Sequence, residues 1–198
     1  MSNLVKSKHD KYTTSNPISR KLVNNFFLKF GELYNLTAPK NVLDVGCGEG
    51  LVLDYLNSKF KLNDTFAIDF DENEVKSAKK NLPFCNVNIG NIYDIQFNEN
   101  EFDLVICSEV LEHLIKPHEA IKEIHRVTKK HALLSVPREP IWRILNMVRL
   151  KYWGGLGNTP DHLNHWSKRN FILFAEKYFN VIEVKSPLPW TIILCEKK

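Results

Sequence analysis

Residues 41–50 read NVLDVGCGEG, and this stretch decides the fold. An apolar strand runs into three glycines at alternate positions, Gly46, Gly48 and Gly50, and a helix-like stretch, LVLDYLNSKF, follows at once. Glycine permits unusual backbone angles at such a turn and lets a ligand approach where a Cβ would block it. The start of the next helix offers free N–H groups. The stretch therefore predicts a strand–turn–helix unit that holds a ligand.

The acids around this turn indicate which ligand it holds. Asp69 ends the next apolar run, TFAID, where an acid commonly accepts hydrogen bonds from ribose hydroxyls. The glycine spacing is G-x-G-x-G, whereas dinucleotide sites have G-x-G-x-x-G, and Asp44 lies inside the strand end. An acid at that position would repel a pyrophosphate but suits a cationic ligand that carries an amino acid. We therefore predict an adenosine-type cofactor that is not a dinucleotide.

The ordered string DVGCGEG, with Asp69 correctly placed, resembles the first motif of the class I S-adenosylmethionine-dependent methyltransferases. In that family the glycine loop holds the methionine moiety, and the acid that matches Asp69 binds ribose. Gly90-Asn91 stands where the family usually has Gly-Asp, and the Asn91 carbonyl oxygen can still accept a hydrogen bond from the adenine amino group. The run EFDLVICSEVLEHLIKP resembles the fourth-strand segment of the type 11 group, so that recognisable similarity covers residues 41–137. The resemblance implies that S-adenosyl-L-methionine is bound by Asp44, Gly46, Cys47, Gly48, Gly50, Asp69, Phe70, Asn91, Ile92, Ser108 and Glu109.

A second motif, E-x-x-E-H, comprises Glu109, Glu112 and His113. If a helical turn follows the strand, the two glutamates share a face with the histidine beside them. Carboxylates with an imidazole suit a divalent cation such as Mg²⁺ or Mn²⁺. The motif also occurs in type 11 sequences with no known metal, where the leucines pack and the charges meet solvent or cofactor.

Two methyltransferase families resemble the chain in this motif. Small-RNA 3′-terminal 2′-O-methyltransferases combine E-x-x-E-H with a histidine in a later D-H-(three residues)-W-[ST] string. Here that string is DHLNHWS over residues 161–167, so that His162 would be the fourth metal ligand. Ubiquinone-pathway O-methyltransferases also carry E-V-L-E-H and a later histidine. In either case the metal would hold a hydroxyl near the methyl group and lower its pKa.

Two histidines are candidate catalytic residues. His113 and His165 could act as general bases because the pKa of histidine is near neutral. The alternative for His165 is a packed, hydrogen-bonded residue beside Trp166.

The order of elements predicts an α/β fold. Strands and helices alternate through the first two thirds of the chain, which favours a parallel sheet with right-handed crossovers. We expect a three-layer Rossmann-like sandwich whose seven-stranded sheet is mostly parallel, with an antiparallel last strand and a helical insertion after the fifth strand. The 198 residues are expected to form one methyltransferase domain. Its parts would be an N-terminal tail and lid helix (1–36), the cofactor-binding core (41–137), a substrate-side insertion (138–166), and a last helix with a strand pair (167–198).

Two flanking segments carry further signals. Residues 1–21 hold five basic residues and one acid, which equals the net charge of +4, because the remainder balances at 22 basic and 22 acidic residues. Such a basic tail suits nucleic acid, an anionic membrane or an acidic substrate, or is a solvated terminus. Its segment KYTTSNPISR could fold over the cofactor as a lid.

The insertion has a basic character and places Ile141, Leu145, Val148 and Tyr152 on one helical face, which is compatible with a membrane surface. Trp142 and Trp153 would line an apolar acceptor pocket or anchor the core of the insertion.

The composition excludes other classes. The four cysteines form no C-x-x-C pair, which argues against a disulfide framework or a zinc site. No apolar run approaches the ~20 residues of a spanning helix, and the first ten residues lack the apolar core of a signal peptide, so we expect a cytoplasmic protein.

The favoured function is O-methylation of a small molecule or a lipid or glycan precursor. The alternatives are a divalent-metal-dependent RNA 2′-O-methyltransferase and a catalytically silent cofactor-binding partner protein. The sequence predicts neither the acceptor nor the oligomeric state.

Overall fold

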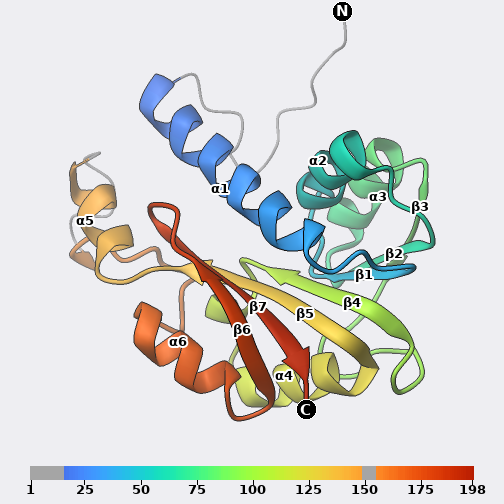
Figure 1. Cartoon of the computed structure of the whole chain (residues 1–198). Helices are drawn as coiled ribbons and strands as arrows, with labels where there is room; N and C mark the ends of the chain where they lie inside the picture. The colour runs from blue at the N-terminus through green and yellow to red at the C-terminus, as the bar shows by residue number, and fades with distance from the viewer. Residues whose placement is uncertain (1–15, 149–154) are drawn as a thin grey trace, which may run out of the picture.

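The computed structural model describes residues 16–148 and 155–198. A seven-stranded sheet lies between two layers of helices (Figure 1), as expected for a three-layer α/β sandwich. The strands are β1 (Val42–Val45), β2 (Thr65–Asp69), β3 (Cys85–Ile89), β4 (Phe102–Ser108), β5 (Thr128–Pro137), β6 (Phe179–Lys185) and β7 (Trp190–Lys197). The helices are α1 (Pro17–Asn35), α2 (Leu51–Phe60), α3 (Glu72–Asn81), α4 (Pro117–Val127), α5 (Ile141–Val148) and α6 (Lys168–Ala175), with a 3₁₀ turn, η1, at Leu111–His113.

The strand order is β3-β2-β1-β4-β5-β7-β6. Strands β1 to β5 are parallel to one another, whereas β7 runs antiparallel to both β5 and β6, which confirms the expected antiparallel last strand. The order reverses between β1 and β4, because the chain runs outward from β1 to β3 and then returns to the other side of β1. Ligands of open α/β sheets bind at the carboxyl ends of the strands at such a switch point.

Each face of the sheet has its own apolar core. Successive strand residues point to opposite faces. Leu43 and Val45 therefore join the core beneath α4 and α6, while Val42 joins the core beneath α1, α2 and α3. Burial on both faces explains why β1 and β4 are nearly continuous apolar runs.

Helix α1 belongs to this layered core. Asn16 accepts hydrogen bonds from the N–H groups of Ile18 and Ser19 and so begins the helix, with Pro17 in its first turn. Phe26, Phe30 and Leu33 are fully buried and recur at helical spacing along one face of α1. The lid role expected for residues 1–36 stays a prediction, and the tail with its segment KYTTSNPISR lies largely outside the described residues.

The insertion after β5 contains a helix, as predicted. An isolated bridge joins Arg138 to Trp166, and the Glu139 N–H donates to the Trp166 carbonyl, so that the insertion begins and ends at one point of the fold. The predicted helical face continues to Tyr152, which lies with Trp153 outside the described residues. In the part of the chain that the structure describes, no helix is long and apolar enough to cross a bilayer.

The start of β5 differs from the sequence prediction. We expect a helix to about Lys129 and a strand from Ala132, but α4 ends at Val127 and β5 begins at Thr128. The early residues are drawn into the sheet because His131 pairs with Leu104 of β4 and with Glu196 of β7.

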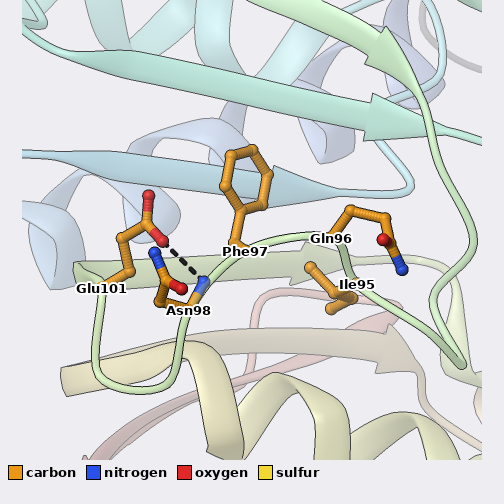
Figure 2. A pocket seen from close by; sticks show the side chains of 5 residues that line it. All are labelled: Ile95, Gln96, Phe97, Asn98 and Glu101. Carbon is orange, nitrogen blue, oxygen red and sulfur yellow. Dashed lines mark hydrogen bonds between the residues drawn. The ribbon is translucent and has the colours of Figure 1, made fainter.

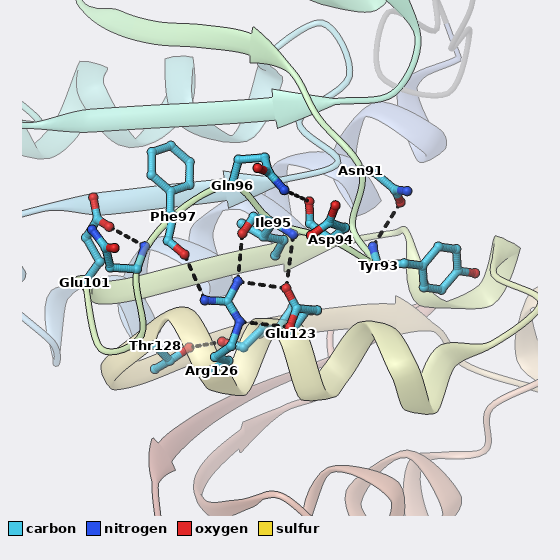
Figure 3. Close-up of polar contacts among 12 residues, drawn as sticks. Asn91, Tyr93, Asp94, Ile95, Gln96, Phe97, Glu101, Glu123, Arg126 and Thr128 are labelled. Atoms are coloured by element: carbon cyan, nitrogen blue, oxygen red, sulfur yellow. Dashed lines mark hydrogen bonds and ion pairs between the residues drawn. The ribbon is translucent and has the colours of Figure 1, made fainter.

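Arg126 ties the loop between β3 and β4 to the end of α4. Its guanidinium donates to the carbonyls of Ile95 and Phe97 and to the Glu123 carboxylate, which in turn accepts from the Ile95 N–H (Figure 3). A depression of about 350 Å³ lies beside this loop, lined by Ile95, Gln96, Phe97, Asn98 and Glu101 (Figure 2). Because this depression precedes β4, it opens at the amino end of that strand, at the opposite edge from the carboxyl ends where ligands bind.

We predict that Arg126→Ala lowers the free energy of unfolding by about 2 kcal/mol, because charge-assisted hydrogen bonds to two loop carbonyls and a carboxylate are lost together. Urea unfolding measures this effect. Lys122→Ala, on the exposed face of the same helix, is the matched control and should change little. Equal unfolding free energies for the two variants would show that the arginine does not hold the loop.

Candidate cofactor and acceptor site

The glycine turn after β1 is fixed by backbone hydrogen bonds to β2. The Ile68 carbonyl accepts from the N–H groups of Gly46 and Cys47, at 2.8 and 3.1 Å. Gly46, Gly48 and Gly50 have φ values of 76°, 53° and 86°, in the left-handed region that favours glycine. Among the described residues, no atom lies within 4 Å of the place where a Cβ on Gly48 would stand. The turn therefore presents open backbone at Gly48, which is what a closely approaching ligand requires.

Asp69 is oriented by the same turn. Its carboxylate accepts from the Gly48 N–H at 2.8 Å and from the Asp71 N–H at 3.0 Å. Because these bonds tie the end of β2 to the glycine loop, the carboxylate lies beside the open backbone. This is the position expected for a ribose-binding acid.

Asp44 is a buried carboxyl group at the end of β1. Burial raises its pKa to about 8, and the nearby Asp69 carboxylate adds to the increase. The same environment raises the pKa of the Cys47 thiol, so that this residue remains a thiol at neutral pH. Two acids at one point disfavour a further anion and favour a cation, which fits the sulfonium and ammonium groups of S-adenosylmethionine.

The remaining predicted cofactor residues follow β2 and β3. Phe70 follows Asp69 and is 84% exposed, so that its ring is available to a flat ligand. Asn91 is exposed, and its side-chain oxygen accepts from the Tyr93 N–H at 3.0 Å (Figure 3). Ile92 packs partly against the core. Their contacts with a cofactor stay predictions.

The carboxyl end of β4 adjoins the glycine loop. A Cβ on Gly46 would stand 2.5 Å from Val110, so the loop and the residue after Glu109 are in direct contact. Ser108 and Ser135 pair across β4 and β5, with their hydroxyls 2.9 Å apart. No motif in the sequence pointed to Ser135, because only the register between β4 and β5 brings it beside Ser108.

The Glu109 carboxylate does not lie with the other three predicted metal ligands. Its carboxylate accepts from the Trp190 indole N–H at 2.7 Å and from the Ser135 hydroxyl at 3.3 Å. The backbone at Glu109 has φ of 60°, so that the strand ends in a left-handed residue and not in the helical turn we assumed. The expectation that Glu109 and Glu112 share a face therefore fails, because the turn begins only at Leu111.

Three of the four predicted metal ligands do come together. Glu112, His113 and His162 each offer a ligand atom, and these atoms all lie within 4.8 Å of one another. Glu112 and His162 are buried, and the His113 ring stands perpendicular to the His162 ring at 5.0 Å. The His113 Nδ1 lies 2.8 Å from the Asp161 carbonyl oxygen, which makes Nδ1 the protonated nitrogen and leaves the lone pair on Nε2. This is a donor set suited to a borderline divalent cation.

Asn164 joins the insertion to the turn that carries Glu112. Its side-chain amide donates to the carbonyls of Leu111 and Leu114, and its backbone N–H donates to the Glu112 carbonyl. The Leu163 N–H donates to that same carbonyl at 2.8 Å. These bonds fix His162 beside Glu112 although the two residues are far apart in the sequence. Asn164 was missed, although it lies inside the DHLNHWS string that pointed to His162.

Tryptophan side chains connect the two halves of the site. Trp142 stacks on His162 with ring centroids 5.6 Å apart, and Trp190 lies between Trp142 and Phe26 of α1. Trp142 is half-buried, so that it anchors the insertion and also borders the histidine cluster. No motif in the sequence pointed to Trp190 as a site residue, because its partners come from three distant segments.

His165, the other candidate base, lies at the foot of the insertion. Its Nδ1 is 3.6 Å from a Glu139 carboxylate oxygen. It does not belong to the group of Glu112, His113 and His162 among the described residues. A catalytic role for His165 stays a prediction.

Known proteins resemble part of this chain in sequence. Residues 43–136 match the family model described as a methyltransferase domain. A probable S-adenosylmethionine-dependent methyltransferase of Mycobacterium tuberculosis (strain H37Rv) is 28% identical over 117 residues, which cover 57% of this chain and 42% of that protein. A ubiquinone biosynthesis O-methyltransferase of Coxiella burnetii is 31% identical over 112 residues, which cover 54% of this chain and 47% of that protein.

The solved structures agree on the fold. A protein from Pyrococcus horikoshii OT3 matches with a TM-score of 0.72 at 16% identity, over 96% of each chain. The chain spans less than half the length of these two curated relatives. Residues 43–136 therefore carry the sequence pattern of a methyltransferase domain, within a fold that the solved structures share.

Proposed function

We propose that the chain transfers a methyl group from S-adenosylmethionine to a hydroxyl of a small molecule or of a lipid or glycan precursor. One observation carries this proposal: the glycine loop with its two acids directly contacts the segment Glu109–His113, which leads into a cluster of a carboxylate and two imidazoles. The donor side and a hydroxyl-binding side thus adjoin at the switch point of the sheet. The likeness to the Coxiella O-methyltransferase supports oxygen as the acceptor atom.

The residues of the donor side would hold the cofactor through complementary groups. Asp69 would accept from the ribose hydroxyls, the Gly48 backbone would border the methionine moiety, and Phe70 would cover the adenine. When bound, S-adenosylmethionine supplies an electrophilic methyl group, whose bond to sulfur breaks, with the electron pair kept by sulfur, as the bond to the acceptor oxygen forms. The chain contributes alignment of the acceptor, exclusion of water and removal of the hydroxyl proton, and alignment alone supplies about 7–11 kcal/mol in well-oriented systems. Where no cation occupies the cluster, we assign proton removal to His113 through Nε2.

We further propose that Glu112, His113 and His162 bind a divalent cation such as Mg²⁺ or Mn²⁺ that holds the acceptor hydroxyl. The cation would lower the pKa of the hydroxyl and so assist its ionisation. The same cluster favours a second candidate function, metal-dependent 2′-O-methylation of RNA. Against RNA, residues 22–198 carry no net charge, whereas RNA-binding surfaces are strongly basic.

The first test is calorimetric titration with S-adenosylmethionine followed by a screen of labelled methyl transfer into small molecules, lipid extracts and RNA. Incorporation into a hydroxyl-bearing metabolite supports the proposal, and incorporation into RNA favours the second candidate. Cofactor binding with no transfer to any acceptor would favour a silent partner protein. Absence of cofactor binding would contradict all three functions.

Gly48→Ala should weaken cofactor binding by about tenfold or more, because a Cβ would enter the open space at the turn. The variant should still fold, with a loss of about 1 kcal/mol from the left-handed backbone. Calorimetry measures the affinity, and thermal unfolding measures the stability. Gly155→Ala, where the nearest atom would be 3.7 Å from the new Cβ, is the control and should bind normally.

Cofactor binding should release a proton from Asp44. With its pKa near 8 in the empty site, this group is protonated at pH 6.5, whereas a cationic ligand favours the ionised form. The affinity should therefore rise by up to about tenfold per pH unit from pH 6 to pH 8 and then level off. Calorimetry at pH 6.5 in two buffers of different ionisation enthalpy counts the released proton. A pH-independent affinity with no proton release would contradict this prediction.

The same group affects the stability of the empty protein. Because the folded pKa of Asp44 exceeds its unfolded value, the stability that its protonation provides is full below about pH 4 and is lost as pH rises through 8. Asp44→Asn should therefore raise the melting temperature relative to the native chain, and by more at pH 8.5 than at pH 5. It should also lose the proton release on cofactor binding.

The metal proposal predicts one Mn²⁺ per chain in a titration followed by electron paramagnetic resonance. His162→Ala and Glu112→Gln should abolish this binding while calorimetry shows normal cofactor binding, because both residues lie on the acceptor side. His118→Ala, whose ring instead pairs with the Tyr178 hydroxyl, is the control. No Mn²⁺ binding by the native chain, or binding that survives in His162→Ala, would refute the metal site.

A further inference from the structure

His162 reaches the cluster of Glu112 and His113 from a distant segment of the chain. It belongs to the insertion, whereas the other two residues follow β4 directly. An imidazole that rotates freely would offer its lone pair to an ion for only part of the time. Side chains around a metal site usually prevent this by orienting the rings that bind the ion.

One turn of the insertion holds both Trp142 and His162. The Thr159 carbonyl accepts from the His162 N–H at 3.0 Å, and the Thr159 hydroxyl accepts from the Trp142 indole N–H, also at 3.0 Å. The Asn146 amide donates to the same hydroxyl at 3.3 Å and to the Gly157 carbonyl at 2.9 Å, so that the turn is fixed to α5. Thr159 therefore aligns the indole with the imidazole.

The indole then limits how the imidazole can stand. The rings of Trp142 and His162 are stacked, with centroids 5.6 Å apart and planes inclined by 30°. Trp190 packs on Trp142 with centroids 6.0 Å apart, and its own indole N–H is bound by the Glu109 carboxylate. Because Trp142 is bound at its N–H and supported by Trp190, it presents a fixed surface to the imidazole.

We propose that Trp142 is a positioning residue that orients the His162 imidazole for the divalent cation. This role rests on the proposed metal site, and it adds that a side chain without a metal-binding atom sets the affinity of that site. Without the indole the His162 ring could turn away. The ion would then keep Glu112 and His113 and lose its third ligand from the chain for part of the time.

Titration with Mn²⁺ followed by electron paramagnetic resonance tests this role in three variants. Trp142→Leu should weaken Mn²⁺ binding by about 10- to 100-fold, as is typical when a residue that orients a metal ligand is lost. Trp142→Phe keeps a ring that can stack and should recover most of that affinity. Thr159→Val removes the hydroxyl that accepts from the indole and should weaken binding severalfold.

Pulsed electron paramagnetic resonance gives a readout that a general loss of stability would not reproduce. Mn²⁺ bound to the native chain should show nitrogen couplings from both imidazoles, those of His113 and His162. In Trp142→Leu the coupling from His162 should weaken or vanish while the coupling from His113 persists. Trp142→Phe should restore both couplings.

Phe60→Leu is the matched control. Phe60 is half-buried like Trp142, and its ring packs on Tyr34 with centroids 5.0 Å apart. It ends α2, which runs from the glycine turn back toward the start of β2, at the opposite edge of the sheet from the cluster. This variant should bind Mn²⁺ as the native chain does. Circular dichroism shows whether each variant folds, and Thr159→Val keeps the test decisive if Trp142→Leu does not.

The outcomes separate the positioning role from the metal site itself. Native affinity with both imidazole couplings in folded Trp142→Leu and Thr159→Val would overturn the positioning role and leave the metal site standing. A loss in Trp142→Leu that Trp142→Phe does not recover would also overturn it, because stacking would then not orient the imidazole. Absence of Mn²⁺ binding by the native chain would refute the metal site and the positioning role together.

Discussion

The site depends on a lock, meaning a set of hydrogen bonds, that joins the glycine turn after β1 to the carboxyl end of β2. The Ile68 carbonyl receives two N–H groups of the glycine turn, and the Asp69 carboxylate receives a third from Gly48. These bonds determine where the turn stands and leave its backbone open toward a ligand. Because the turn then contacts Val110, the same lock also sets the distance between the donor side and the segment after β4.

The donor side carries an electrostatic cost that a cationic ligand relieves. Asp44 and Asp69 approach one another where burial disfavours charge, and the pKa of Asp44 rises to about 8 as a result. The empty protein therefore gains stability when Asp44 is protonated, whereas a ligand with positive charge favours its ionised form. Buried acids that destabilise the empty fold in this way are typical of functional sites.

The acceptor side is assembled from segments that the sequence keeps apart. Asn164 fastens the insertion to the turn of Glu112, and Trp190 reaches from β7 to Glu109 and Trp142. The insertion thereby brings His162 to the cluster with one surface and exposes Ile144 and Val148 on another. One segment thus borders the proposed hydroxyl-binding cluster and also carries exposed apolar side chains.

The sequence by itself determined the glycine turn after β1, because residues 46–50 are contiguous and their glycine spacing allows few backbone paths. It also determined the order of strands and helices, which follows from local apolar patterns. It was wrong about Glu109, since the left-handed backbone there and the Trp190 indole remove this carboxylate from the expected metal set. Only the tertiary structure placed Ser135, Asn164 and Trp190 in the site and left Ile144 and Val148 of α5 exposed. Those outcomes depend on strand register and on contacts between distant segments, which no local spacing encodes.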